Sequence, residues 1–375
     1  MDISTICVHG CDKRYDTTGA VAVPIFASAT FAHPGVGKST GFDYSRSLNP
    51  TTEHLEQKIA ALEGGANAVA FSSGMAAVTA LMELFAPGDH IIASDDLYGG
   101  TFRLFLHISK KNGIKISYAN TIEEIEKEIT PCTRAVLIET PTNPMMHVTD
   151  IAAVAEITKK KKLLLIVDNT FLTPYFQRPL SLGADIVLHS GTKYLGGHND
   201  TLCGLLVIKD FMLYDGIRFI AKTTGACLSP FDSFLIIRGL KTLAVRMERQ
   251  QETAMAIARW LSEQNSVKKV YYIGLPDHPG LEISRKQSSG FGGMISFSVR
   301  DAQTAVKILE SVKLIQYAES LGGVESLITY PMLQTHADMP EKERITRGID
   351  DCLLRLSVGL ESADDLIADL KQALA

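Results

Sequence analysis

The chain has 375 residues, and its 37 Lys and Arg against 42 Asp and Glu give a formal net charge of −5. With 46% hydrophobic and 21% charged residues, the composition is that of a globular protein and not of a disordered chain. The mild negative charge excludes a general electrostatic attraction to nucleic acid or to an anionic membrane surface.

Residues 1–45 are rich in Gly, Pro and Thr, and we expect them to form an extended arm. Asn49-Pro50 then predicts a helix cap followed by proline at the first helical position, with Leu55 and Ile59 on one face. Met1–Ser4 lacks the basic and apolar regions of a secretory signal, so a cytoplasmic location is predicted.

The six cysteines are scattered, which is typical of reduced thiols and not of a disulfide framework. The spacing of Cys7 and Cys11 resembles half of a metal site, but no second Cys/His pair with ligand spacing follows, and no metal is predicted. The apolar run Leu163–Val167 is too short to cross a bilayer, which takes ~20 residues.

Between residues 60 and 210, short apolar runs alternate with helical patterns, such as the capping-box spacing at Thr121–Glu124 and the segment Asp150–Lys161. Most runs are continuously apolar, as in strands that are covered on both faces. The predicted strands are Ala68–Ser72, Ile91–Ser94, Lys115–Ala119, Ala135–Glu139, Leu163–Asp168, Asp185–His189 and Leu202–Ile208. This alternation predicts an α/β fold with a mostly parallel, seven-stranded sheet and helices on both faces.

The C-terminal third has a different pattern, which begins with a long helix from Lys241 to about Glu263. Further expected elements are strands at Val267–Ile273, Gly293–Val299 and Leu353–Val358, a helix at Ala302–Ser311, and a last helix from Ser362. This part reads as a smaller α+β domain. We therefore predict an arm at residues 1–48, a larger domain at 49–240 and a smaller one at 241–375.

Four strand ends carry unusual residues, and ligands of open parallel sheets bind beyond the carboxyl ends of the strands. After the first predicted strand, the backbone N–H groups of Gly74 and Met75 begin a helix, where they can bind a phosphate. Asp168 ends an apolar strand, where a carboxylate needs a cationic or donor partner. A protonated heterocyclic nitrogen would serve, and a capping or turn aspartate fits the segment equally well.

Lys193 follows the next predicted strand, and 25 residues separate it from Asp168, so both side chains can face one sheet edge. A lysine in a low-dielectric cleft loses its proton readily, and the free amine can form an imine with an aldehyde. Ser190 and Thr192 are suited to hydrogen bonds with phosphate oxygens. Taken alone, a lysine is normally a solvated surface residue.

Tyr98 follows another predicted strand and could stack on a planar ring, although a core tyrosine is the simpler interpretation. One cofactor uses all four features, since pyridoxal phosphate (PLP) needs a phosphate site, a lysine, a partner for its ring nitrogen and a stacking surface. Arg355, in a late predicted strand, is the natural fork for a substrate carboxylate.

With these residues in order, the chain resembles the Cys/Met-metabolism family of PLP enzymes, which includes cystathionine γ-synthases, cystathionine γ- and β-lyases and methionine γ-lyases. The segments that carry the resemblance are Tyr44–Arg46, Ser73–Ala76, Tyr98–Thr101, Glu139–Pro144, Val167–Thr170, Ser190–Tyr194, Ala318–Gly323 and Arg355–Gly359. The resemblance implies a fold-type-I, aminotransferase-like architecture and a homotetramer made of two dimers.

The resemblance also implies roles for particular residues. Lys193 would hold PLP covalently and move protons with help from Tyr98, which stacks on the ring, and Asp168 would pair with the ring nitrogen. The cofactor phosphate would be held by Gly74, Met75, Ser190 and Thr192, and by Tyr44 and Arg46 of a neighbouring subunit. The substrate would be held by Asn143, Ser320 and Arg355 at its carboxylate and by Arg103 and Glu319 elsewhere.

Positions that differ between the enzymes of this family indicate which reaction to expect. Methionine γ-lyases carry a cysteine where this chain has Gly100 and commonly an apolar residue where it has Glu319, whereas an acid there resembles cystathionine γ-synthases and γ-lyases. Arg103 with Glu319 favours cystathionine γ-lyase, with the γ-synthase and then the β-lyase as alternatives. Thr52 stands where the family usually has arginine, so the chain departs from the family motif next to the arm. A non-catalytic relative is disfavoured because Lys193 and its partners are intact.

Overall fold

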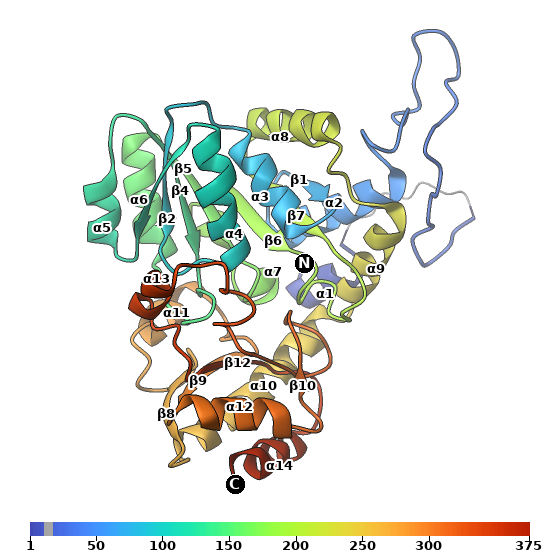
Figure 1. Ribbon diagram of the computed structural model, residues 1–375. Coiled ribbons are helices and arrows are strands. Elements are labelled where there is room, and N and C mark those ends of the chain that lie inside the picture. Colours follow the sequence, from blue (N-terminus) through green and yellow to red (C-terminus); the bar gives the residue numbers. More distant parts are fainter. Residues whose placement is uncertain (11–17) are drawn as a thin grey trace.

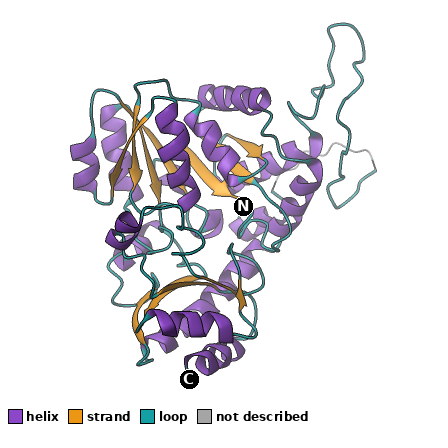
Figure 2. Cartoon of the chain, in the orientation of Figure 1, coloured by secondary structure: helices purple, strands orange, loops and turns teal. Residues whose placement is uncertain are grey.

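The structure is a computed structural model that describes residues 1–10 and 18–375. It contains a larger layered part around one sheet, a smaller part around a second sheet, and an N-terminal segment that projects away from the body (Figure 1). Colouring by secondary structure shows helices on both sides of the larger sheet (Figure 2). The α/β fold class predicted from the sequence is therefore confirmed.

The larger sheet has seven strands in the order β1-β7-β6-β5-β4-β2-β3. Only β7 runs antiparallel to its neighbours, so the sheet is mostly parallel, as predicted. The strands are β1 (Asn67–Phe71), β2 (His90–Ser94), β3 (Lys115–Ala119), β4 (Thr133–Glu139), β5 (Leu164–Asp168), β6 (Ile186–Ser190) and β7 (Gly204–Ile208). Each predicted strand in this region exists, with ends shifted by two residues or fewer.

Successive residues of the central strands pack on opposite faces of this sheet, which explains their continuous apolar runs. In β5, Leu165 and Val167 belong to the core cluster on one face, whereas Ile166 belongs to the cluster on the other. Helices supply the rest of both clusters. The main ones are α2 (Pro50–Glu63), α3 (Gly74–Met82), α5 (Ile122–Glu128), α6 (Ile151–Lys161) and α8 (Phe211–Thr224).

The smaller sheet has five strands in the order β10-β11-β12-β9-β8. These are β8 (Val267–Tyr271), β9 (Met294–Val299), β10 (Gln316–Tyr317), β11 (Leu327–Thr329) and β12 (Leu353–Ser357). A separate core cluster lies between this sheet and the helices α10 (Leu243–Ser262), α12 (Ala302–Ser311) and α14 (Ala363–Leu374). The structure thus contains the two sheets expected on either side of residue 240, and the exact domain boundaries stay a prediction.

The remaining elements are short or connect the two parts. They are α1 (Ile3–Val8), α4 (Gly99–Arg103), a π-helical segment η1 (Leu104–Ser109), α7 (Thr173–Phe176), a 3-10 helix η2 (Pro179–Leu182), α9 (Pro230–Leu240), α11 (Leu281–Gln287) and α13 (Glu341–Thr346). The helix α9 leads directly into α10, which spans from the larger to the smaller part in Figure 1.

The expectation of an extended arm over residues 1–45 was wrong at its start, because Ile3–Val8 forms α1. Asp2 caps this helix through a bond from the backbone N–H of Ser4. Ile3, Ile6 and Cys7 lie at helical spacing and pack on the larger core, which explains why this short segment is helical. From Thr18 to Leu48 the described chain has no helix, in agreement with the expectation.

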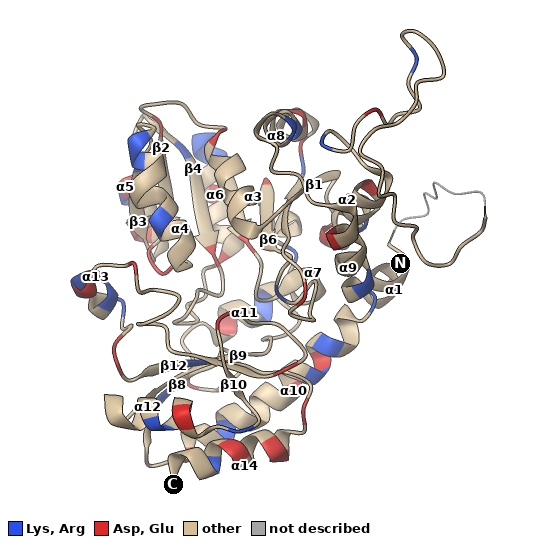
Figure 3. Cartoon of the chain, turned by 45° about the vertical axis from the view of Figure 1, so that its right-hand side comes forward, with Lys and Arg blue, Asp and Glu red and all other residues tan. Residues whose placement is uncertain are grey.

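Charged residues of both signs are interspersed over the surface, for example along α10 (Figure 3). That helix carries Glu248, Arg249 and Glu252 at exposed positions. No helix among the described residues is both long and apolar enough to cross a membrane.

Candidate active site

A cavity of about 320 Å³ lies at the carboxyl ends of the central strands of the larger sheet, where the smaller part covers it. Residues from at least eight separate segments line it. It brings together most of the residues singled out in the sequence, namely Gly74, Met75, Tyr98, Asn143, Asp168, Ser190, Thr192, Lys193, Glu319, Ser320 and Arg355.

Lys193 enters the cavity from the turn that follows β6, and its Nζ donates to Oγ of Ser320 at 3.0 Å. Burial and the positive charge of Arg355 lower the pKa of the Lys193 amine to about 8, which Glu319 opposes. About a tenth of the amine is therefore unprotonated at pH 7. This is the state that attacks a carbonyl carbon or accepts a proton.

Asp168 is the last residue of β5, and its Oδ1 accepts from the backbone N–H of Thr170 at 3.0 Å and from its hydroxyl at 2.6 Å. Burial raises the pKa of the Asp168 carboxyl, and these two bonds act in the opposite direction. The Thr170 hydroxyl also accepts from the backbone N–H of Ser190, so that it ties the ends of β5 and β6 together. The sequence predicted neither this bond nor the presence of Thr170 in the cavity.

The start of α3 forms one end of the cavity. Ser73 caps the helix by accepting from the N–H of Ala76, and the first N–H groups of a helix have no partner within the helix. A side chain at Gly74 would come within 3.1 Å of Ser190, so glycine permits this close approach. The Thr192 hydroxyl accepts from the N–H of Cys203 at 3.0 Å. Hydroxyls and helix N–H groups thus converge where an anionic group would be stabilised.

Arg355 lies in β12 at the opposite side of the cavity and is only 1% exposed. Its guanidinium donates to Oδ1 of Asn143 at 2.8 Å and to the carbonyl of Ser320 at 2.9 Å, and its buried Nε has no partner within residues 1–10 and 18–375. Burial lowers the pKa of Arg355 to about 10, so the group stays cationic at neutral pH. A buried cation with an unused donor is suited to bind a carboxylate.

Ser320, which is bonded to both Lys193 and Arg355, has a strained backbone conformation with φ of 93°. Such a conformation costs about 1–3 kcal/mol and persists only where the surroundings over-determine it. The bonds to Lys193 and Arg355 provide that constraint.

Tyr98 lines the cavity just before α4, and its side chain is 39% exposed. Its backbone N–H donates to Oε2 of Glu139 at 3.0 Å. A side chain at Gly100 would come within 2.5 Å of the Tyr98 ring, so glycine at that position allows the ring to lie where it does.

Three predicted residues do not line this cavity. Arg103 is half exposed and forms an ion pair with Asp338. Tyr44 is 47% exposed, and Arg46 lies over its ring and donates to the carbonyl of Lys222 at 2.6 Å. The cavity also contains Glu139 and Thr335, which were not singled out.

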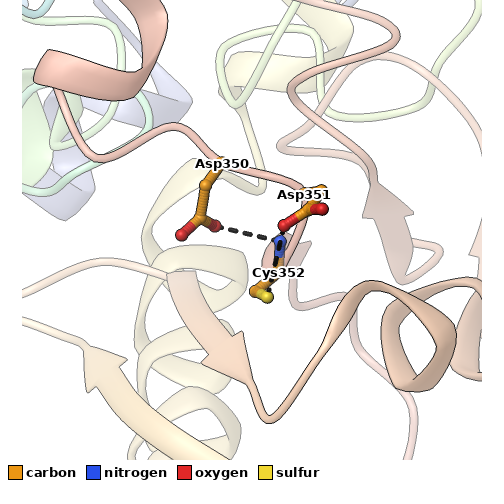
Figure 4. A group of neighbouring side chains, drawn as sticks. All are labelled: Asp350, Asp351 and Cys352. Atoms are coloured by element: carbon orange, nitrogen blue, oxygen red, sulfur yellow. Dashed lines mark hydrogen bonds between the residues drawn. The ribbon is translucent and has the colours of Figure 1, made fainter.

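One cluster outside the cavity has the composition of a metal site (Figure 4). The possible ligand atoms of Asp350, Asp351 and Cys352 lie within 4.8 Å of one another. Asp350 accepts from the N–H of Cys352 at 2.9 Å, a bond that is typical of an aspartate turn, and both acids are exposed. We assign no metal to this turn. Cys11 lies outside the described residues, so its pairing with Cys7 cannot be compared.

A lysine with a lowered pKa, a carboxyl at the next strand end, a helix N-terminus and a covered sheet edge together define the fold-type-I class of PLP-dependent enzymes. The unsatisfied buried donor of Arg355 fits the carboxylate of an amino-acid substrate. A family model described as Cys/Met metabolism PLP-dependent enzyme matches residues 4–375. The chain belongs to this family, and PLP is its cofactor.

Similar proteins agree on the family and differ in reaction. The chain is 48% identical to a cystathionine γ-lyase of Bacillus subtilis, over 100% of this chain and 99% of that protein. It is 50% identical to a cystathionine γ-synthase of Haemophilus influenzae, over 100% and 98%. It is 48% identical to a cystathionine β-lyase of Lactococcus lactis, over 99% and 98%.

Among solved structures, a cystathionine γ-lyase of Lactobacillus plantarum complexed with L-serine matches with a TM-score of 0.96. The two chains are 44% identical, over 100% of this chain and 98% of that one. The protein is therefore an enzyme of trans-sulfuration chemistry, in agreement with the interpretation of its sequence. Relatives of nearly equal identity carry three different activities, so identity alone does not select one of them.

Proposed function

We propose that the enzyme breaks the γ C–S bond of cystathionine and releases cysteine, 2-oxobutanoate and ammonia. The observation that carries this proposal is the pair of opposite charges in one cavity, with Arg355 on one side and Glu319 beside Lys193. Cystathionine carries a carboxylate and an ammonium group at each end. A cavity with both a buried cation and an acid is suited to hold its two ends.

PLP, when bound, withdraws electrons from the α-carbon of the substrate and so allows its proton to leave. The amine of Lys193 takes that proton and returns it at another atom, with Tyr98 assisting. Asp168 holds the ring nitrogen protonated, and Gly74, Met75, Ser190 and Thr192 hold the phosphate.

Arg355, with Asn143 and Ser320, binds the substrate carboxylate next to the reacting carbon. Glu319 meets the distal ammonium group. Arg103 was expected to contact substrate, and its ion pair with Asp338 at the surface does not support that role in this chain.

We further propose a homotetramer of two dimers, in which the arm at residues 1–48 completes the site of a neighbouring subunit. Tyr44 and Arg46 would reach the neighbour's cofactor phosphate. Support comes from the projection of residues 18–48 from the body (Figure 1) and from exposed apolar residues such as Val21 (89% exposed) and Val36 (106% exposed). Thr52, in place of the family arginine, is buried against Ser233 at 3.0 Å.

Product analysis of the purified enzyme with cystathionine tests the reaction. Cysteine with 2-oxobutanoate supports the proposal, and homocysteine with pyruvate would assign β-cleavage instead. The γ-synthase is the second candidate, and a γ-synthase is among the similar proteins. Formation of cystathionine from cysteine and an O-acylhomoserine, without net cleavage, would select it.

A further inference from the structure

Two carboxyl groups lie side by side at the edge of the large sheet that faces the cavity. Glu139 ends β4 and Asp168 ends β5, and the two residues are direct partners in the parallel register. Neighbouring strands lie ~4.8 Å apart, so the two side chains leave the sheet at almost the same point. Both line the cavity, and Glu139 is only 6% exposed.

Two adjacent buried carboxyl groups cannot both be ionised without a large cost, so one of them retains its proton. The hydrogen-bond donors decide which one. Asp168 receives the N–H and the hydroxyl of Thr170 on one oxygen, and the hydroxyl bond is short at 2.6 Å. Glu139 receives backbone N–H groups only, from Tyr98 at 3.0 Å and from Asn143, and no hydroxyl. Short bonds from several donors favour the charged form, which places the negative charge on Asp168.

The negative charges around Glu139 act in the same direction, whereas the positive charge of Arg355 opposes them. Burial and then the negative charge of Asp168 raise the pKa of Glu139 well above its ordinary value, and Asp96 adds to this effect. The positive charge that faces it from the smaller sheet is Arg355, which is already bonded to Asn143 and to the carbonyl of Ser320.

We propose that Glu139 is a positioning residue that works in its protonated form. Its carbonyl oxygen holds the backbone N–H of Tyr98, and its neutrality leaves Asp168 as the charged member of the pair. This inference rests on the roles proposed for Asp168 and Tyr98. In this arrangement Glu139 fixes the position of the Tyr98 ring. By staying neutral, it also leaves the negative charge opposite the cofactor nitrogen on Asp168.

Infrared spectroscopy of the cofactor-free enzyme tests the protonation directly. The difference spectrum between wild type and Glu139→Gln should show the loss of a carboxylic-acid C=O band at neutral pH. Asp369→Asn is the matched control, which should lose carboxylate bands and no carboxylic-acid C=O band. Asp369 is 7% exposed, and although burial acts to raise its pKa, bonds from the N–H groups of Ile315, Lys313 and Leu314 hold that pKa below its ordinary value. Carboxylate bands lost in Glu139→Gln would overturn the proposal.

Two further variants test the positioning. Glu139→Gln keeps the shape and the acceptor, so its Kd for PLP and the pH dependence of the bound-cofactor absorbance should stay within about twofold of wild type. Glu139→Ala loses the acceptor, and its Kd should rise about tenfold. A wild-type Kd in Glu139→Ala, or an altered absorbance profile in Glu139→Gln, would contradict the proposal.

The variant Asp168→Asn distinguishes a failure of the Glu139 proposal from a failure of the role proposed for Asp168. It should change the pH dependence of the cofactor absorbance by removing the charge opposite the ring nitrogen. An unchanged profile in Asp168→Asn would reject the proposed role of Asp168 itself, whatever the Glu139 variants do. If Glu139→Ala does not fold, the infrared spectrum and the Glu139→Gln profile still decide the question.

Discussion

Lys193 owes its reactivity to its surroundings, because the same amine on the surface would be almost fully protonated at neutral pH. Burial removes water from the ammonium form, and Arg355 adds repulsion, which together bring the pKa to about 8. Roughly a tenth of the amine is then unprotonated at pH 7, compared with less than about one part in a thousand at the ordinary value of 10.5. The buried arginine that is suited to a substrate carboxylate therefore also activates the lysine.

This environment predicts how fast the cofactor-free enzyme recombines with PLP at different pH values. The pKa of Lys193 is lowered, so the reactive free amine increases as pH rises, with its midpoint at about 8. The rate of recombination, followed by visible absorbance, should rise about tenfold from pH 7 to a plateau above about pH 9.

Arg355→Gln is the informative variant for this pH profile. Without the repulsion from Arg355, the pKa of Lys193 should increase, and the midpoint of the rate profile should move to higher pH. Lys193→Ala should show no covalent attachment at any pH. A wild-type rate that keeps rising beyond pH 10 would contradict the lowered pKa.

At the scale of elements, the strands of the large sheet were predictable because each is covered on both faces and is apolar throughout. The helix α8 was not, since only Ile217 and Ala221 of its residues are buried, whereas Phe211 and Phe219 are more than half exposed. Leu213, Tyr214, Ile217, Ile220 and Ala221 lie at helical spacing and pack on the core, but the exposed apolar residues of the other face obscure this pattern in the sequence. The antiparallel direction of β7 also has no local sequence signal, because hydrophobic pattern does not encode strand direction.

The candidate site also contains residues that the sequence indicated and residues that it did not. Asp168 was identified as a carboxyl at the end of an apolar strand, and Glu139 carries the same signal at the end of β4 but was considered only as part of a longer segment. Thr335 reaches the cavity from a segment more than a hundred residues beyond Lys193 along the chain. Only the tertiary packing of the smaller part places it there, and no local pattern could have indicated it.

The ends of β5 and β6 are held in position by a buried bridge from α2. The last residue of that helix, Glu63, accepts on Oε1 from Nε2 of His189 at 2.6 Å and from Nδ2 of Asn169 at 2.9 Å. Glu63, His189 and Asn169 are all fully buried. Because His189 precedes Ser190 and Asn169 follows Asp168, one carboxyl fixes the spacing between two cavity-lining residues.

Glu63→Ala should therefore be strongly destabilising, because it leaves two buried donors without an acceptor. At about 1–3 kcal/mol for each unpaired group, the expected loss in the free energy of unfolding is roughly 2–6 kcal/mol. Urea denaturation of the cofactor-free enzyme measures this loss. The control is Glu156→Ala at an exposed position of α6, with a change within about 0.5 kcal/mol. Equal stability of the two variants would show that the bridge does not hold the strands.

At the scale of the whole molecule, we expect a second subunit to complete the proposed active site. The helix N-terminus and hydroxyls that converge near Gly74 include no arginine or lysine apart from Lys193 among the described cavity residues on that side. Arg46 lies outside the cavity of its own chain, on a segment that projects from the body. A cation supplied by a second subunit would balance the phosphate charge that a helix N-terminus compensates only in part.

Subunit mixing tests this arrangement with two variants that are each expected to be inactive, Arg46→Ala and Lys193→Ala. In a hybrid dimer, the subunit that retains Lys193 receives the intact Arg46 of its neighbour, so one of the two sites is complete. Random mixing in equal amounts makes half of the dimers hybrids, and about a quarter of wild-type activity should return. The activity is measured after joint unfolding and refolding of the two purified variants.

The pattern of recovery separates sharing between subunits from a role within one chain. If Arg46 served its own subunit, each site of the hybrid would lack either Lys193 or Arg46, and mixing would restore no activity. The control for refolding yield is a chain that carries both substitutions, mixed with wild type in the same way. Arg46→Lys should retain part of the activity, because it keeps the charge and loses the planar fork that binds phosphate through two donors. Absence of recovery beside normal refolding would reject the shared site and leave the fold and the cofactor assignment unchanged.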